Sequence, residues 1–342
     1  MSVAGTWDGE ENSQQEIIRE TTQFGAFWRR FRKQRGGIVG LMVLALMLVG
    51  IILVPIVSPL PALSIITGDG TWRIPVNPNP DMWFAPAATT DPATGLTYWF
   101  GTDLLGRDVL TRLFVGGRTT LPIALIGAIL TTMLGIAIGL IAGYLGGWVD
   151  TIIMRVTDFV LAWPLIPAYI LFFTFVVGGT DPYEFYHNPL PLLTNVVLTF
   201  LIFTWMGVAR LVRISVLSLR QQQFIEATRA LGASNARIIL KHILPNVMAP
   251  ILVAGTLMVS DFILFEALLA FFGKGIQEPP FPSWGTLLAY GQSQIWAVAT
   301  PNPFENIRFY FFLLPCLMIL MTVLSINAVA DALRNAMSIS HN

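Results

Sequence analysis

The most restrictive feature of this 342-residue chain is a series of six apolar segments, each long enough to cross a lipid bilayer. A membrane-spanning helix needs about 20 mostly apolar residues. The segments are Ile38–Val57, Leu121–Leu145, Phe159–Gly178, Leu190–Gly207, Val247–Phe272 and Phe309–Ala330. Because a bilayer core offers no water to unpaired backbone groups, we expect an all-α, polytopic membrane protein with six transmembrane helices.

The composition agrees with a membrane class and argues against several functions. Apolar residues make up 54% of the chain and charged residues 12%, against about 45–50% and about 25% in soluble domains. The net charge is zero and no stretch looks like a basic recognition helix, so we expect no nucleic-acid partner. The single Cys316 excludes an intramolecular disulfide. The three histidines show no ligand spacing, so we expect no metal site.

The distribution of basic residues predicts the orientation. If the N-terminus is cytoplasmic, fourteen of the twenty lysines and arginines fall in segments on that side. We therefore expect both termini and the charged segment Gln221–Asn246 to be cytoplasmic, in a multi-pass protein of the cell membrane. The expected divisions are a cytoplasmic tail (1–36), a first transmembrane helix (37–58), an extracytoplasmic loop (59–116), a transmembrane domain (117–334) with a cytoplasmic loop (210–245), and a second tail (335–342).

Two outer segments, Ser58–Phe100 and Gly273–Arg308, are rich in turn-forming residues and are predicted to be irregular. The second contains Trp284, Tyr290 and Trp296. Aromatic residues at a membrane surface commonly form an interfacial belt, which is the favoured interpretation. The alternative is that they line the access path of a substrate.

Small residues recur at every fourth position along the second apolar segment: Gly127, Thr131, Gly135, Gly139, Gly143 and Gly147. Such a face lets two helix backbones approach closely within a membrane. We expect helix packing at Gly135, Gly139 and Gly143. A gating role, in which helices slide along this face, stays open.

Prolines and acids interrupt the later apolar segments. Pro164, Pro167 and Pro315 remove backbone hydrogen bonds, so they predict kinks. Asp261 and Glu266 lie within the fifth segment, where carboxylates are costly and often functional. Either residue can belong to a transport pathway or play a structural part; a structural hydrogen bond is favoured over substrate contact.

The charged segment Gln221–Asn246 reads as two short helices joined by a glycine turn. An apolar stripe at helical spacing consists of Phe224, Ile225, Thr228 and Leu231. Gly232 follows where a helix would take a left-handed C-cap, and a second helical run, Ala236–Leu244, ends at Pro245. The pattern predicts a compact elbow that projects from the membrane. An amphipathic helix lying on the inner leaflet is the alternative.

This elbow resembles the EAA loop of type I ABC importer permeases, which runs Glu-Ala-Ala, three residues, Gly, nine residues, Ile, any residue, Leu-Pro. The matching residues are Glu226, Ala227, Gly232, Leu244 and Pro245. Thr228 stands in place of the second alanine and His242 in place of the isoleucine. The form found here is typical of dipeptide and oligopeptide permeases.

The resemblance covers the chain from about Phe27 to Met337. Over this range the chain is similar to the C-type subunit of those permeases. The segment 101–108, GTDLLGRD, resembles a motif that precedes the second span of that subunit. Further landmarks are Arg112, Arg118, Met154-Arg155, Asp158, Pro164, Trp205 to Arg213, Glu266, Pro282 to Gly285 and Asn327 to Arg334. The chain departs from the family in its longer Ser58–Phe100 loop and in FGKG at 272–275, where FLGLG is usual.

The resemblance implies a permease subunit of a binding-protein-dependent importer for dipeptides or oligopeptides. It implies three kinds of partner besides the lipid bilayer: a second homologous permease, two cytoplasmic ABC ATPase subunits and an extracytoplasmic substrate-binding protein. The coupling helix that docks the ATPase would comprise Phe224, Ile225, Glu226, Ala227, Thr228, Arg229, Ala230, Leu231, Gly232, Ala233 and Ser234.

The chain has no phosphate-binding motif G-x-x-x-x-G-K-[ST]. We therefore expect a non-catalytic subunit that binds no cofactor, with ATP and Mg used by its partners. Nickel complexes and oligosaccharides are alternative substrates. A secondary transporter or channel that uses Asp261 and Glu266 as an ion site is an alternative function, as is a membrane scaffold, but the ion site gives no reason for the helix–glycine–helix elbow.

Overall fold

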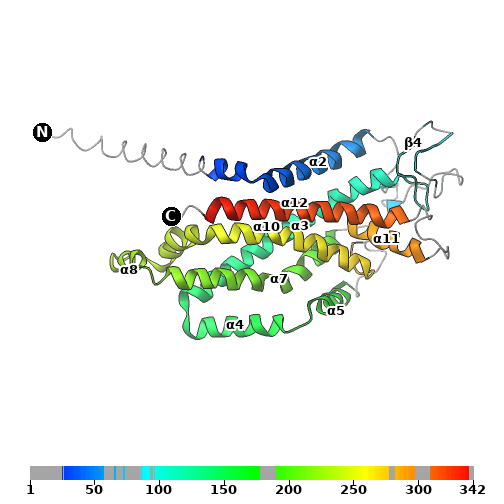
Figure 1. The fold of residues 1–342 in the computed structure, drawn as a ribbon. Coiled ribbons are helices and arrows are strands. Elements are labelled where there is room, and N and C mark those ends of the chain that lie inside the picture. The colour runs from blue at the N-terminus through cyan, green and yellow to red at the C-terminus, as the bar shows by residue number, and fades with distance from the viewer. Residues whose placement is uncertain are drawn as a thin grey trace.

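The computed structural model is an elongated bundle of helices (Figure 1). It describes residues 25, 27–57, 65–66, 72–73, 85, 87–92, 95, 97–177, 190–276, 282–296 and 309–338. The longest helices are α2 (Arg35–Val57), α3 (Val109–Leu145), α7 (Leu190–Leu219), α10 (Leu244–Phe271) and α12 (Phe309–Ser338). The shorter ones are α4 (Gly147–Leu161), α5 (Leu165–Val177), α8 (Gln223–Ala230), α9 (Asn235–Arg237) and α11 (Trp284–Trp296). A π-helix, η2 (Ile238–Ile243), joins α9 to α10.

The strands in the described residues are two short antiparallel pairs. One pair joins β1 (Ile65–Ile66) to β2 (Trp72–Arg73), and the other joins β3 (Thr89–Thr90) to β4 (Thr97–Tyr98). The helical fold class is therefore confirmed. The start of α2 and the end of α12 lie at the same end of the bundle as α8, and β4 and α11 lie at the opposite end (Figure 1).

Five helices in the described part of the chain are long and apolar enough to span a membrane. A sixth span exists only if α4 and α5 are counted together, because the two helices meet at 91°. The segment Phe159–Gly178 was predicted to be one kinked helix, and this is wrong. The chain breaks at residues 162–164, where Pro164 cannot donate a helical hydrogen bond and disfavours helical geometry in the residue before it.

The predicted small-residue face lies along α7 for most of its length. A Cβ atom added at Gly135, Gly139 or Gly143 would approach within 2.6–2.8 Å of the Cβ atom of Val208, Val212 or Val216, respectively. The glycines and the valines both recur every four residues, so one stripe fits against the other. The closeness of the two backbones follows from the missing glycine side chains.

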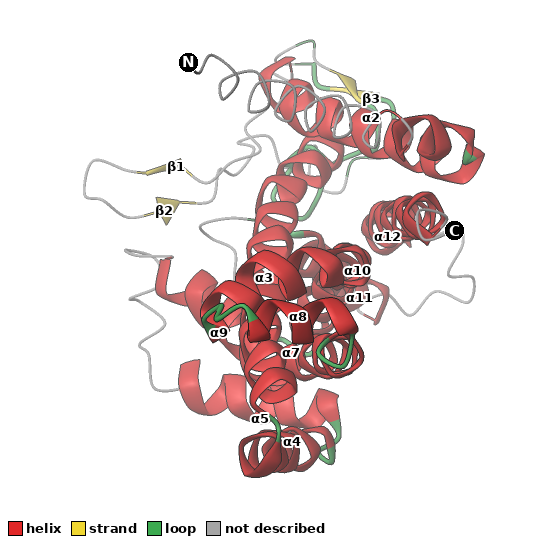
Figure 2. Ribbon diagram, turned by 90° about the vertical axis from the view of Figure 1, so that its left-hand side faces the viewer, coloured by secondary structure: helices red, strands yellow, loops and turns green. Residues whose placement is uncertain are grey.

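The bundle has two main hydrophobic cores. The larger one joins α2, α3, α5, α7, α10, α11 and α12, with buried Phe200, Phe262 and Trp284 at its centre. The second lies nearer α8 and joins α3, α7, η2, α10 and α8. Figure 2, seen from the α8 end, shows α8 and α9 directly over the ends of α3 and α7. The predicted elbow is therefore part of the folded bundle.

A side chain from α3 satisfies a backbone group that proline leaves unpaired in α2. Pro55 has no N–H, so the carbonyl of Ile51, four residues earlier, loses its helical donor. Arg118 Nε donates to this carbonyl at 3.0 Å, and its Nη2 donates to the carbonyl of Ile52 at 3.1 Å. Arg118 precedes the apolar segment Leu121–Leu145 that the sequence predicted, but α3 begins at Val109, about three turns before that segment.

Candidate functional site

The elbow is a tight helix–turn–helix built around Gly232. This glycine has a φ of +81°, which confirms the predicted left-handed C-cap. Its N–H donates to the carbonyl of Arg229 at 3.0 Å, and the N–H of Ala233 donates to that of Thr228 at 3.3 Å. Ser234 then caps α9 by accepting from the N–H of Arg237. The two caps fix the direction in which α8 projects.

One side of the elbow is buried in the second core. Ile225, Ile238 and Ile243 have no solvent exposure, and they pack with residues of α3, α7 and α10. The hydroxyl of Tyr144, on α3, donates to Asn235 Oδ1 at 2.7 Å. The elbow is thus held by apolar contacts and by one hydrogen bond between side chains.

The other side of the elbow is exposed. Leu231 is 89% exposed and Phe224 is 44% exposed, although both are large and apolar. Glu226 and Arg229 lie on the same short helix and are exposed too. Ile225, included in the predicted docking helix, faces the core of the chain itself, so its side chain cannot reach a partner without unfolding. The exposed face therefore consists of Phe224, Glu226, Ala227, Arg229, Ala230 and Leu231.

Two cations of α7, and one just after its end, tie α7 to neighbouring elements at this end of the bundle. Arg213 pairs with Asp150, and Arg210 pairs with Asp158, both on α4. Arg220 Nη1 donates to the carbonyls of Gly143 and Tyr144, at 3.2 Å each, where α3 ends and its carbonyls lack helical donors. No spacing in the sequence indicated these contacts, because their partners are more than 50 positions apart.

Glu266 lies in a hydrogen-bonded junction of α10, α11 and α3. Its carboxylate is 2% exposed and accepts from Ser283 Oγ at 2.6 Å. The N–H of Trp284 donates to Thr120 Oγ1 at 3.0 Å, and its indole N–H donates to the carbonyl of Leu113 at 2.8 Å. These contacts are structural. They also correct two predictions, because residues 284–296 form a helix where an irregular loop was expected, and the fully buried Trp284 is neither an interfacial nor a path-lining residue.

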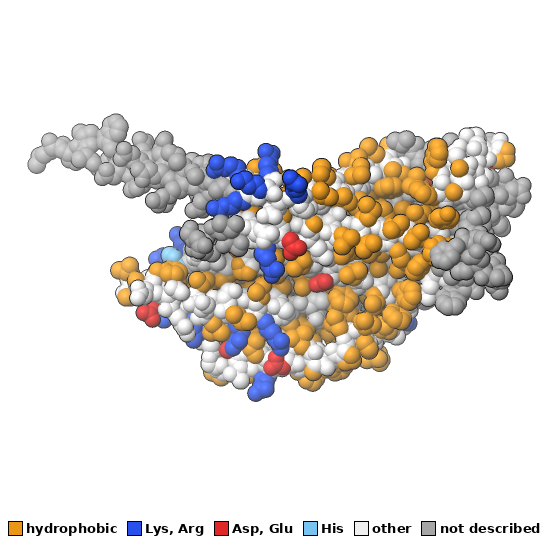
Figure 3. All heavy atoms as spheres, viewed as in Figure 1, with side chains coloured by type: hydrophobic (Ala, Val, Ile, Leu, Met, Phe, Trp, Pro, Cys, Tyr) orange, Lys and Arg blue, Asp and Glu red, His pale blue; other side chains and the backbone are white. Residues whose placement is uncertain are grey.

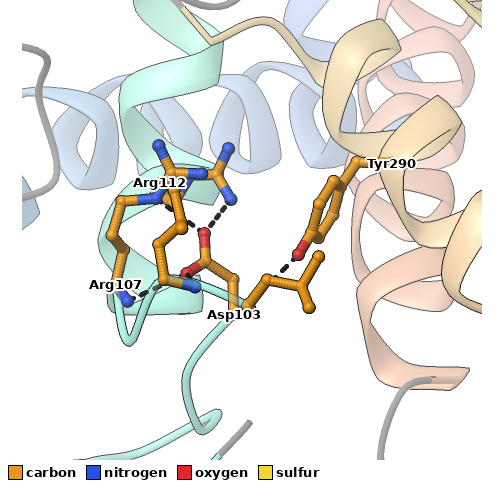
Figure 4. A network of polar contacts seen from close by, with 6 residues as sticks. Asp103, Arg107, Arg112 and Tyr290 are labelled. Carbon is orange, nitrogen blue, oxygen red and sulfur yellow. Dashed lines mark hydrogen bonds and ion pairs between the residues drawn. The ribbon is translucent and has the colours of Figure 1, made fainter. Parts of the chain in front are cut away.

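The segment 101–108 folds around one buried carboxylate (Figure 4). Asp103 accepts from the N–H groups of Leu105 and Arg107, from Arg107 Nε at 2.7 Å and from Arg112 Nη1 at 2.5 Å. The hydroxyl of Tyr290 accepts from the N–H of Leu104 at 3.1 Å, and the guanidinium of Arg112 lies 5.7 Å from the Tyr290 ring. The cluster fastens this segment to α11.

Two titratable groups at this end have shifted pKa values. Burial, and then the nearby Asp103 carboxylate, raises the pKa of the Tyr290 phenol above its ordinary value, so the phenol stays protonated. Burial also raises the pKa of Asp108, which caps α3 by accepting from the N–H of Thr111 at 2.8 Å. The cluster is built to hold the segment in place.

A cavity of about 340 Å³ opens along α10 at the α8 end of the bundle. Its walls come from α7, α10 and α12. They include Leu211, Asn246, Pro250, Leu257, Arg334 and Met337. The lining is mostly apolar, with an amide and a guanidinium among the polar groups. No group of three or more His, Cys, Asp or Glu residues that could hold a metal is found within the described ranges.

Two family models match the chain. Residues 135–338 match the model described as the inner membrane component of binding-protein-dependent transport systems, and residues 22–67 match the N-terminal transmembrane domain of oligopeptide transport permease C. The first match covers more than half of the 342 residues. The chain belongs to this family of transport components. It is therefore a multi-pass inner-membrane permease subunit, which confirms the resemblance seen in the sequence. The alternative function, a secondary transporter or channel, does not agree with membership of this family.

Known relatives extend over most of the chain. The oligopeptide permease protein OppC of Haemophilus influenzae is 31% identical over 90% of this chain and 86% of its own length. The dipeptide permease protein DppC of Alkalihalophilus pseudofirmus is 36% identical over 74% and 79%. The glutathione permease protein GsiD of Escherichia coli is 32% identical over 92% and 90%. Among solved structures, the MetNI methionine ABC transporter matches with a TM-score of 0.44 at 16% identity, over 65% of this chain and 96% of that one.

Proposed function

We propose that this permease subunit imports peptides, and that the exposed face of its elbow docks a cytoplasmic ABC ATPase subunit. One observation carries the docking proposal: α8 is anchored by the buried Ile225 while Leu231 and Phe224 remain exposed beside Glu226 and Arg229. A fixed helix that exposes apolar side chains within a charged rim is suited to a groove on another protein.

The remaining parts of the importer follow from this docking. The chain would pair with a second homologous permease, two ATPase subunits would bind below them, and an extracytoplasmic binding protein would deliver the substrate. This arrangement puts both termini of the chain in the cytoplasm. ATP and Mg would be bound and used by the ATPase subunits, with this chain binding no cofactor and catalysing no reaction. Relatives named for oligopeptide, dipeptide and glutathione transport favour peptides over nickel complexes or oligosaccharides.

The elbow could transmit motion because it is continuous with α10. The π-helix Ile238–Ile243 leads directly into that helix, and Ile225 packs in the same core as Ile243 and Val247. A displacement of α8 by a closing ATPase dimer would therefore move α10 as a rigid element. Rigid-body motions of this kind convert closure on one side of a transporter into alternating access.

The test is ATP-driven uptake of a peptide by the reconstituted transporter carrying Glu226→Arg or Gly232→Asp. We expect both variants to insert normally but to lose uptake, because the first reverses a rim charge and the second strains the turn at a φ of +81°. Arg155→Glu, a charge reversal on an exposed residue of α4, is the control and should transport normally. Normal uptake by the two elbow variants would refute the docking assignment.

A further inference from the structure

One face of α10 is left open by its neighbours. In Figure 1, α10 lies between α12 and α7, and in the matching view of Figure 3 acidic side chains show among the hydrophobic ones in this region. Asn246, Pro250 and Leu257 line the cavity of about 340 Å³ along this face. In an α-helix, residues three or four apart share a face. The helix face that lines the cavity therefore continues from Leu257 to Asp261, which lies one turn further from the elbow and beyond the residues that line the cavity.

Asp261 has an environment unlike that of Glu266. It is partly exposed, and it forms no hydrogen bond or ion pair with the residues that the structure describes. The structural hydrogen bond that the sequence favoured for it is thus not found there. Within a membrane, an ionised side chain without a partner is costly, so such residues face a cavity or a pathway and meet a charged or polar ligand there.

A second polar group near Asp261 also lacks a partner. Tyr169, on α5, is fully buried, and its hydroxyl has no hydrogen-bond partner among the described residues. Its ring lies 5.0 Å from that of Phe265, which is one turn from Asp261 on α10. A carboxylate and a phenol hydroxyl are both acceptors that suit an ammonium group, and the aromatic rings beside them suit a cation too.

We propose that the substrate passes along this face of α10, and that Asp261 binds a protonated amine of the substrate during passage. This inference rests on the proposed function, because a peptide with a free N-terminus supplies such an ammonium group. Asp261 is then a specificity-determining residue of the pathway. Because α10 continues from the elbow, ATPase closure would move Asp261 together with the cavity wall.

The test compares two peptides in the complete transporter, with its binding protein, second permease and ATPases, reconstituted in liposomes. Trialanine carries the N-terminal ammonium, and propionyl-alanyl-alanine lacks it but is otherwise the same. Each is supplied at a concentration that saturates the binding protein, so that the initial uptake rate reports the permease. The variants are Asp261→Asn, Asp261→Glu and, as the matched control, Asp331→Asn, which removes an exposed acid at the end of α12.

We expect Asp261→Asn to lower trialanine uptake about tenfold, as loss of a hydrogen bond between charged groups does, while uptake of the analogue stays unchanged. Asp261→Glu should retain most of the trialanine rate, and Asp331→Asn all of it. Equal losses for both peptides, or no loss for either, would overturn the role of Asp261. Loss of the second permease from the purified Asp261→Asn complex would also overturn it, by making the residue part of a subunit contact. If the unaltered transporter imports neither peptide, the peptide substrate of the proposed function fails first, and the inference fails with it.

Discussion

At the scale of single residues, two carboxylates five positions apart on α10 have different roles. Glu266 is buried and accepts a hydrogen bond from Ser283, whereas Asp261 is partly exposed and lacks a described partner. The sequence placed both acids in one apolar segment and could not separate them, because the distinction depends on which neighbouring helix faces each one. A buried acceptor is costly to leave unpaired, so Glu266 fixes the position of α11.

Ser283→Ala tests this structural role. Removing the hydroxyl takes a hydrogen-bond donor from the buried Glu266 carboxylate, so we expect a loss of about 1–3 kcal/mol in the free energy of unfolding. The measurement is the denaturant-induced unfolding of the purified permease. Ser293→Ala, at an exposed serine within α11, should cost less than about 0.5 kcal/mol. Equal stability of the two variants would show that the hydrogen bond between Ser283 and Glu266 does not stabilise the protein.

At the scale of elements, close helix packing depends on small residues that face larger ones, and on side chains that pair with backbone carbonyls lacking a helical donor. The glycines of α3 fit against the valines of α7. Arg118 of α3 donates hydrogen bonds to the carbonyls of Ile51 and Ile52 in α2, close to Pro55. The two devices differ in kind, because the first depends on a missing side chain and the second on a present one. Each gives a separate prediction.

The substitution Gly139→Val should separate α3 from α7, because an added Cβ would lie 2.6 Å from the Ala209 carbonyl and 2.7 Å from Val212 Cβ. Overpacking of this kind costs about 1–3 kcal/mol. The same change at Gly207, where an added Cβ meets nothing within 4 Å, is the control. The two variants are compared by thermal unfolding in detergent. A Gly207→Val protein as unstable as Gly139→Val would show that close packing of α3 against α7 does not depend on the glycine at position 139.

A double-mutant cycle tests the link between Arg118 and Pro55. Arg118→Gln should destabilise the protein, because the Ile51 carbonyl then loses its donor. In a Pro55→Ala background the helix can supply its own N–H, so the same substitution should cost less. A coupling energy of about 1 kcal/mol is expected from unfolding measurements on the four proteins. Strict additivity would mean that Arg118 does not replace the missing helical donor.

Some of these features could be predicted from the sequence because they depend on local spacing. The left-handed turn at Gly232 followed from a helix end, and the face of Gly135, Gly139 and Gly143 followed from a repeat of four. The 91° break before α5 was predicted only as a kink at Pro164, and the helix α11 could not be predicted in this way. Apolar composition alone does not distinguish one helix from two, and Trp284 is ordered by contacts to Thr120 and Leu113, far away in the chain.

The elbow shows the same limit on sequence-based prediction. Its apolar stripe was read as a single docking surface that included Ile225. Helical spacing puts such residues on one broad face but does not say whether the core or a partner covers each of them. The structure divides the stripe, with Ile225 in the second core and Leu231 exposed.

At the scale of the whole molecule, a rigid elbow at one end is joined through α10 to a cavity and to Asp261 near its middle. The Asp103 cluster and the Glu266 junction hold the opposite end together. This division suits a subunit that receives force at one end and redirects it along one helix. Transport by such a subunit therefore depends most on the exposed face of α8 being the surface on which an ATPase acts.

Leu231→Glu tests that claim directly, because Leu231 is 89% exposed and its replacement should leave the fold and its thermal midpoint unchanged. The measurement is the amount of ATPase subunit that co-purifies with the permease from membranes containing the whole transporter. We expect the variant permease to keep its second permease partner and to lose its ATPase subunits. Full ATPase co-purification with Leu231→Glu would contradict the claim.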